Sequence, residues 1–146
     1  MKKAFLAMVI MLGLIFLNAQ SILAYQADGI SIEQGKSNGV PFMTGGVGLN
    51  ERAVMKNMAG HYNVRLVFAT ISGAYLTDVK VVIHDGNNRT LIDKESNGPW
   101  FFVDLPKGRY SVTAIHSGTK ETREAALEKT WDTVVFNWKI NASKSK

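Results

Sequence analysis

The run from Asp104 to Tyr110 is the feature that most constrains the fold of this chain. Pro106 and Gly108 lie two positions apart in it, a pairing that favours a tight reversal between two strands. Tyr110 follows the turn and returns to the side of the strand that we expect to be buried. The run therefore predicts two adjacent strands of a small sheet, joined by a short turn.

Short segments of alternating apolar and polar residues recur on both sides of this turn. Turn signals such as Asp85-Gly86-Asn87-Asn88 and Ser117-Gly118-Thr119 separate them at intervals of about 8 to 12 residues. The predicted strands span 62–70, 78–84, 90–95, 100–105, 109–116, 120–127 and 130–138. This spacing predicts an all-β fold, a seven-stranded antiparallel β-sandwich over residues 61–140. Residues 121–129 have helical propensity, but their shortness and the preceding hairpin turn favour an exposed edge strand.

The first two dozen residues have the layout of a secretory signal peptide. Two lysines precede an apolar run from Ala4 to Leu17, and small residues then offer cleavage after Ser21 or Ala24. The run is shorter than the roughly 20 residues that a membrane-spanning helix needs. We therefore expect residues 1–24 to be removed on export. The mature protein is then periplasmic or secreted, with no stable membrane span.

Composition excludes several classes of function. The chain of 146 residues has no cysteine, which excludes thiolate zinc sites and cysteine nucleophiles. Five of its 17 basic residues lie in the signal peptide or after Trp138, and the remaining 12 are balanced by 12 acidic residues. A nucleic-acid-binding domain normally has a net basic surface. We therefore predict no nucleic-acid partner, and we assign residues 141–146 to a basic tail.

Residues 25–60 are predicted to form a glycine-rich arm before the sandwich. The stretch from Tyr25 to Gly48 has no sustained hydrophobic period and is expected to be a loop. Asn50 can cap a short helix over 51–59, and Gly60 can end it. Helical spacing places Val54, Met55 and Met58 on one apolar stripe, with Glu51 near its middle.

Three consecutive aromatic residues, Trp100, Phe101 and Phe102, lie in one predicted strand. Because side chains alternate across a strand, at least one ring must point away from the sandwich core. Such a ring could stack on a sugar or a partner, or the arm could cover it. The predicted helix over 51–59 is too short to be more than marginally stable alone, so we expect its apolar stripe to dock on these rings. Our hypothesis is that release of the arm exposes a partner surface made of Trp100, Phe102, Val54, Met55 and Met58.

The stretch from Tyr62 to Trp138 resembles the carboxypeptidase regulatory-like domains, which are small transthyretin-like or immunoglobulin-like sandwiches. The residues that carry the resemblance are Gly98-Pro99-Trp100-Phe101-Phe102 and Leu105-Pro106-Lys107-Gly108-Arg109-Tyr110. With Gly45-Gly46-Val47-Gly48 and Glu51-Arg52 upstream, the chain is also similar to small exported bacterial proteins of unknown function. The resemblance implies a sandwich fold and an accessory role.

No catalytic, cofactor-binding or metal-binding constellation can be assembled from the sequence. The histidines His61, His84 and His116 form no zinc-binding spacing, and no serine lies in a Gly-x-Ser-x-Gly motif. The glycine run 45–48 lacks the lysine of a phosphate-binding loop. We therefore predict a non-catalytic binding or scaffolding module of the bacterial envelope with a protein partner. The alternative is a small carbohydrate- or ligand-binding domain whose partner is a glycan.

Overall fold

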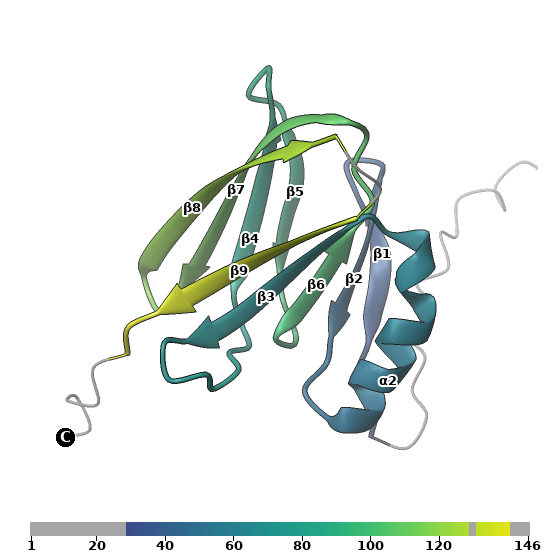
Figure 1. Ribbon diagram of the computed structural model, residues 1–146, viewed down its shortest axis with the longest axis vertical. Coiled ribbons are helices and arrows are strands. Elements are labelled where there is room, and N and C mark those ends of the chain that lie inside the picture. The colour runs from purple at the N-terminus through teal and green to yellow at the C-terminus, as the bar shows by residue number, and fades with distance from the viewer. Residues whose placement is uncertain (1–28, 129–130, 141–146) are drawn as a thin grey trace, which may run out of the picture.

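Two β-sheets pack face to face in the computed structural model, which describes residues 29–128 and 131–140 (Figure 1). The larger sheet has the order β1-β2-β6-β3-β9 and the smaller sheet has the order β5-β4-β7-β8. The described strands are β1 (Glu33–Ser37), β2 (Val40–Gly45), β3 (Val64–Thr70), β4 (Lys80–Asp85), β5 (Thr90–Glu95), β6 (Trp100–Val103), β7 (Gly108–His116), β8 (Thr119–Leu127) and β9 (Asp132–Trp138). Helix α2 (Leu49–Met58) and the 3-10 turn η1 (Ala59–His61) join β2 to β3. The predicted signal peptide and the basic tail lie outside the described residues.

The main hydrophobic core lies between the two sheets. Alternate residues of β3 point into it, and Val64, Leu66 and Phe68 are buried there. The smaller sheet contributes alternate residues in the same way, among them Tyr110 and Val112 of β7. The alternation that predicted these strands therefore reflects burial of one face of each strand against the opposite sheet.

The all-β prediction is confirmed, and all seven predicted strands between Tyr62 and Trp138 are present as β3 to β9. The segment assigned to an edge strand forms most of β8, which lies at one edge of the smaller sheet. The prediction of a wholly antiparallel sandwich was wrong in one respect. Strands β3 and β9 pair in parallel, with Val64 opposite Asp132 and Thr70 opposite Trp138.

The loop predicted from Tyr25 to Gly48 was also wrong over its described part. Residues 33–45 form β1 and β2, an antiparallel hairpin that pairs with β6 and extends the larger sheet. The last four residues of β2, from Phe42 to Gly45, are all buried, because both faces of the strand are covered. No apolar–polar alternation can arise in such a strand, and Pro41 and the neighbouring glycines weaken its strand propensity further.

Helix α2 lies on the outer face of the larger sheet beside β1 and β2 (Figure 1). The predicted cap was wrong, because the N-cap residue is Gly48 and no side chain caps the helix. Met55 packs with Met43, Trp100 and Phe102 in a second apolar cluster that is separate from the main core, and we call it the outer cluster. Strands β2 and β6 therefore each bury one face in the main core, through Phe42 and Phe101, and the other face in the outer cluster.

Candidate functional site

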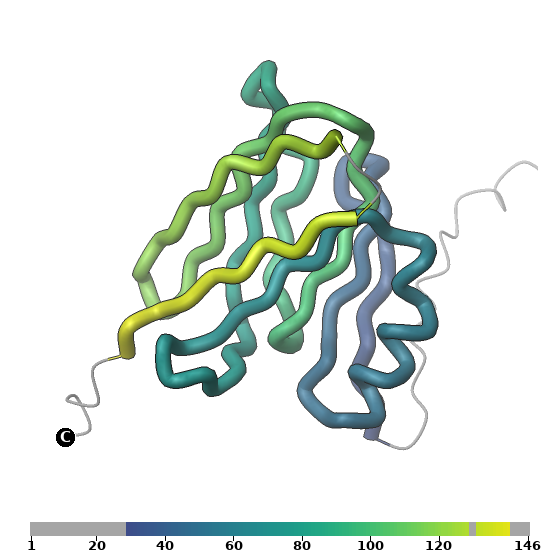
Figure 2. Tube along the Cα trace, viewed as in Figure 1, coloured from purple at the N-terminus to yellow at the C-terminus, as the bar shows by residue number. Residues whose placement is uncertain are grey.

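A groove of about 510 Å³ lies at one end of the sandwich, where three turns meet. The turns are the β1–β2 turn at 38–39, the β4–β5 hairpin at 85–90 and the β6–β7 segment at 106–109. They lie at the same end of the trace, the upper end in Figure 2, although more than 60 residues of sequence separate the first from the last. We call this surface the loop-end groove.

Asp85 organises the hairpin on one side of the loop-end groove. Its Oδ1 accepts hydrogen bonds from the backbone N–H groups of Asn87 at 3.0 Å and Arg89 at 2.9 Å. Its Oδ2 accepts a bond of 3.1 Å from the Nε of Arg89. Asn88 completes the turn with a φ of 60°, which asparagine tolerates better than most residues. The backbone N–H of Arg89, followed by that of Asn87 and the Arg89 charge, holds the pKa of Asp85 below its ordinary value against the effect of burial.

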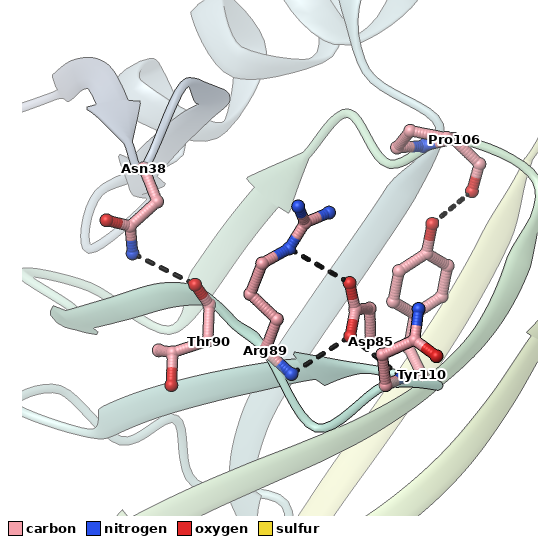
Figure 3. A network of polar contacts seen from close by, with 7 residues as sticks. Asn38, Asp85, Arg89, Thr90, Pro106 and Tyr110 are labelled. Atoms are coloured by element: carbon pink, nitrogen blue, oxygen red, sulfur yellow. Dashed lines mark hydrogen bonds and ion pairs between the residues drawn. The ribbon is translucent and has the colours of Figure 1, made fainter.

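Tyr110 closes the floor of the groove below the turn at Pro106. Its ring is buried, and its hydroxyl donates a hydrogen bond of 2.5 Å to the carbonyl oxygen of Pro106 (Figure 3). Burial, and secondarily the charge of Asp85, raises the pKa of this phenol. Tyr110 is therefore neutral at physiological pH, and its one proton is already used to fix the turn.

The β1–β2 turn is fastened to the smaller sheet across the groove. Asn38, with a φ of 48°, donates from its Nδ2 to the carbonyl oxygen of Thr90 at 3.1 Å (Figure 3). Further along the same edge, Lys94 forms an ion pair of 3.0 Å with Glu33. These contacts hold the edges of the two sheets together, so the groove has walls from both sheets.

The charge of the loop-end groove is predominantly positive. Among its described lining residues, Arg89, Lys107 and Arg109 are cationic and Asp85 is the one acid. Arg89, Lys107 and Arg109 are exposed, and Arg89 leaves 76% of its side chain accessible despite its ion pair. The arrangement can therefore present several charged donors to a bound molecule.

The residues predicted to form a partner surface are brought together, but by burial against one another. Trp100, Phe102 and Met55 are buried in the outer cluster, and Val54 and Met58 pack half-buried around them. This contact agrees with the expectation that the helix docks on the aromatic residues. A partner could reach the three buried side chains only after α2 has moved, so their role as a partner surface stays a prediction.

Two cations border the buried indole of Trp100. The Nζ of Lys56 lies 5.9 Å and the guanidinium carbon of Arg65 lies 5.3 Å from the ring centroid. At these distances each cation is attracted to the face of the ring, and this cation–π attraction stabilises the buried position of Trp100.

Glu51 fixes the start of helix α2 to the segment before β1 and to the connection that follows β2. Its buried carboxylate accepts hydrogen bonds from the backbone N–H groups of Ser31 at 2.8 Å, Gly46 at 2.8 Å and Val47 at 3.0 Å. Arg52 donates to the carbonyl oxygen of Gly46 at 2.7 Å. The glycine run and the Glu-Arg pair singled out in the sequence therefore form one structural unit that holds the β2–α2 connection.

The histidines do not lie in the loop-end groove. His61 is exposed in η1, His84 lies in β4, and the His116 ring lies 5.9 Å from that of Trp138. Within residues 29–128 and 131–140, no three His, Cys, Asp or Glu side chains are grouped as metal ligands. In the same part of the chain, no helix is long and apolar enough to span a membrane.

Two of the three turns can be predicted from the sequence, but the groove that they form cannot. Asp85 to Asn88 and Pro106 to Gly108 are both recognisable as turns, whereas Asn38-Gly39 falls in the segment taken for a loop. Comparison with known protein families, curated proteins and solved structures found no match for this chain.

Proposed function

We propose that the protein is an exported, non-catalytic binding module of the bacterial cell envelope that holds a small polar ligand in the loop-end groove. The observation that carries this proposal is the groove itself, about 510 Å³ in volume and walled by turns from both sheets. Ligand sites commonly have volumes of about 300 to 1,000 Å³. Binding residues are also concentrated on loops that a rigid scaffold positions.

The chemistry of the groove supports binding rather than catalysis. Its carboxylate, Asp85, is already saturated by hydrogen bonds from its own hairpin, and the Tyr110 hydroxyl is already bonded to Pro106. The described lining residues include no histidine, serine or cysteine, so the hydroxyl of Thr90 has no histidine beside it to act as a base. The remaining polar side chains are cations, amides and the Thr90 hydroxyl, which are suited to holding a ligand through hydrogen bonds.

A protein partner bound at the outer apolar cluster is the second candidate. The observation in its favour is that one short helix, α2, covers Trp100 and Phe102. Its apolar contacts with them come mainly from Met55, Val54 and Met58. We rank it second because the loop-end groove is accessible as it stands, whereas the outer cluster requires α2 to move.

Export is tested separately from binding. The full chain is expressed in a bacterial host, and the mature protein is recovered from the periplasm and sequenced from its N-terminus. We expect a start at Ile22 or Tyr25, because cleavage follows Ser21 or Ala24. Soluble cytoplasmic protein with an intact Met1 would overturn the export proposal.

Binding is tested with a variant that fills the groove. Asn87→Trp adds an indole at an exposed lining position, and the backbone N–H that bonds Asp85 is retained. Asn57→Trp makes the same change on the exposed side of α2, outside the groove. Each protein is incubated with small molecules from an envelope extract, separated by gel filtration and examined by mass spectrometry for retained ligands.

We expect the wild-type protein and Asn57→Trp to retain the same compound, and we expect Asn87→Trp to lose it. Circular dichroism establishes that all three proteins are folded. Equal retention by the three proteins, or retention by none, would contradict a binding function of the groove.

A further inference from the structure

We infer that the loop-end groove selects a ligand that carries carboxylate or phosphate groups, an inference that rests on the proposed binding function. Cations from two different walls line the same groove: Arg89 comes from the β4–β5 hairpin, Lys107 from the β6–β7 turn and Arg109 from the start of β7. Because the two turns are separate walls, an anion between them can be contacted from more than one side.

Arg89 is held in position without its hydrogen-bonding capacity being used up. Its Nε donates to the Oδ2 of Asp85, while its terminal nitrogens point away from that carboxylate (Figure 3). A guanidinium fixed through Nε retains donors in a planar fork that matches the oxygens of carboxylate and phosphate. The hairpin therefore orients Arg89 before a ligand arrives, which reduces the entropy lost on binding.

Asp85 does not present an open negative charge to the groove. Both of its oxygens are directed at donors of the hairpin, as its lowered pKa also reflects. Its charge is offset locally by Arg89, which leaves Lys107 and Arg109 without an acid among the described lining residues. The field in the groove therefore attracts anions.

The groove is poorly suited to a neutral sugar. Neutral sugars are held largely by exposed aromatic faces, and Tyr110 is the one aromatic residue among the described lining residues. Tyr110 as a whole residue is only 5% exposed and its hydroxyl is bonded to Pro106, so it offers neither a face nor a free donor. The lack of an exposed aromatic face therefore favours an anionic ligand over the neutral glycan that the sandwich fold would also permit.

Isothermal titration calorimetry with defined probes tests the inference. Inorganic phosphate and citrate represent the two anion types, oligogalacturonate represents a carboxylate-bearing sugar, and a neutral maltose oligomer of matched length is the uncharged comparison. We expect at least one of the three anionic probes to bind and the neutral oligomer not to bind. Binding should weaken as ionic strength rises from about 0.01 M to about 0.15 M, because the screening length falls from about 30 Å to about 8 Å.

A pair of double variants assigns binding to the groove. Lys107→Gln with Arg109→Gln removes two charges from the β6–β7 turn and the start of β7, and we expect affinity for the anionic probe to fall by about tenfold or more. Lys120→Gln with Lys139→Gln removes the same charge at the opposite end of the sandwich, where Lys120 pairs with Ile115 near the far end of β7 and Lys139 follows the end of β9. We expect this control to change affinity by less than about twofold, since its charges lie outside the groove.

The outcomes separate this inference from the proposed function. Equal loss of affinity in both double variants would show a nonspecific charge effect and overturn the inference. Binding of the neutral oligomer that Asn87→Trp abolishes would also overturn it, while leaving the binding function intact. Binding of no probe would likewise overturn it, and the extract experiment would then decide the binding function independently. Phosphate binding without citrate or oligogalacturonate binding would identify phosphate as the recognised group, and the reverse result would identify carboxylate.

Discussion

Glu51 is a buried carboxylate whose hydrogen bonds join the segment before β1, the glycine run and helix α2. A buried carboxylate is tolerated only where donors replace the water that it loses, and three backbone N–H groups do so here. The position of Glu51 near the middle of the apolar stripe is therefore where its carboxylate can reach the β2–α2 connection.

We expect Glu51→Gln to lower the free energy of unfolding by about 1–3 kcal/mol, because an amide NH₂ would face backbone donors that now have an acceptor. Glu33→Gln is the matched control, since Glu33 makes a partly exposed ion pair that contributes about 1 kcal/mol or less. Urea unfolding measures both variants. A loss in Glu51→Gln no larger than that in Glu33→Gln would refute the structural role of this carboxylate.

The lowered pKa of Asp85 predicts that the stability of the protein depends on pH. Its pKa is lower in the folded protein than its ordinary value of 3.8, so folding favours the charged form. The stabilisation is complete above the ordinary pKa and is lost as pH falls through the lower, folded-state pKa. We therefore expect the stability difference between wild type and Asp85→Asn to be largest near pH 6 and to shrink toward about pH 3.

The Asp85 prediction is checked by urea unfolding of both proteins across this pH range. Asp93→Asn, which removes a more exposed carboxylate, controls for the loss of a negative charge. A difference between wild type and Asp85→Asn that stayed constant down to about pH 3 would argue against the hairpin bonds as its source.

At the scale of elements, the strands with one covered face were predictable and those with two covered faces were not. Strand β3 alternates between core residues such as Leu66 and less buried residues such as Arg65, and this period is visible in the sequence. Strand β2 buries Phe42 in one cluster and Met43 in the other, so its period disappears. The parallel pairing of β9 with β3 is set by packing between distant segments, which no local pattern records.

The turn before β6 depends on the small size of Gly98. A Cβ at this position would overlap the backbone of Gly45, where β2 meets β6. Because a backbone cannot move aside like a flexible side chain, we expect Gly98→Ala to lower the free energy of unfolding by about 1–3 kcal/mol. Gly60→Ala is the control, since nothing lies within 4 Å of its added Cβ, and we expect a change of about 0.5 kcal/mol or less. Thermal denaturation of the two variants decides the matter, and equal stability would show that the approach of β2 to Gly98 is not tight.

At the scale of the whole molecule, the loop-end groove could not be predicted because it exists only where three distant turns meet. The turn at 106–109 was recognised from its own residues, and so was the hairpin at 85–90. Their proximity to Asn38 depends on the pairing of β2 with β6 and on the contact of β1 with β5. The chemistry of each turn was therefore readable from the sequence, whereas the site was not.

The two apolar clusters should unfold together, because they share strands. Phe101 faces the main core and Phe102 faces the outer cluster, so β6 cannot lose one contact surface while it keeps the other in register.

Met55→Ala leaves a cavity beside Trp100, and we expect it to lower the free energy of unfolding by about 2–5 kcal/mol. If the clusters are coupled, the urea midpoint measured by far-ultraviolet circular dichroism should fall as much as the midpoint measured by tryptophan fluorescence. Asn57→Ala, on the exposed side of the same helix, should leave both midpoints almost unchanged. An early fluorescence transition in Met55→Ala, with the strand signal unaltered, would instead show that α2 leaves the sheet while the sandwich stays folded. That result would weaken the case for one cooperative unit and would strengthen the outer cluster as a partner surface that the helix uncovers.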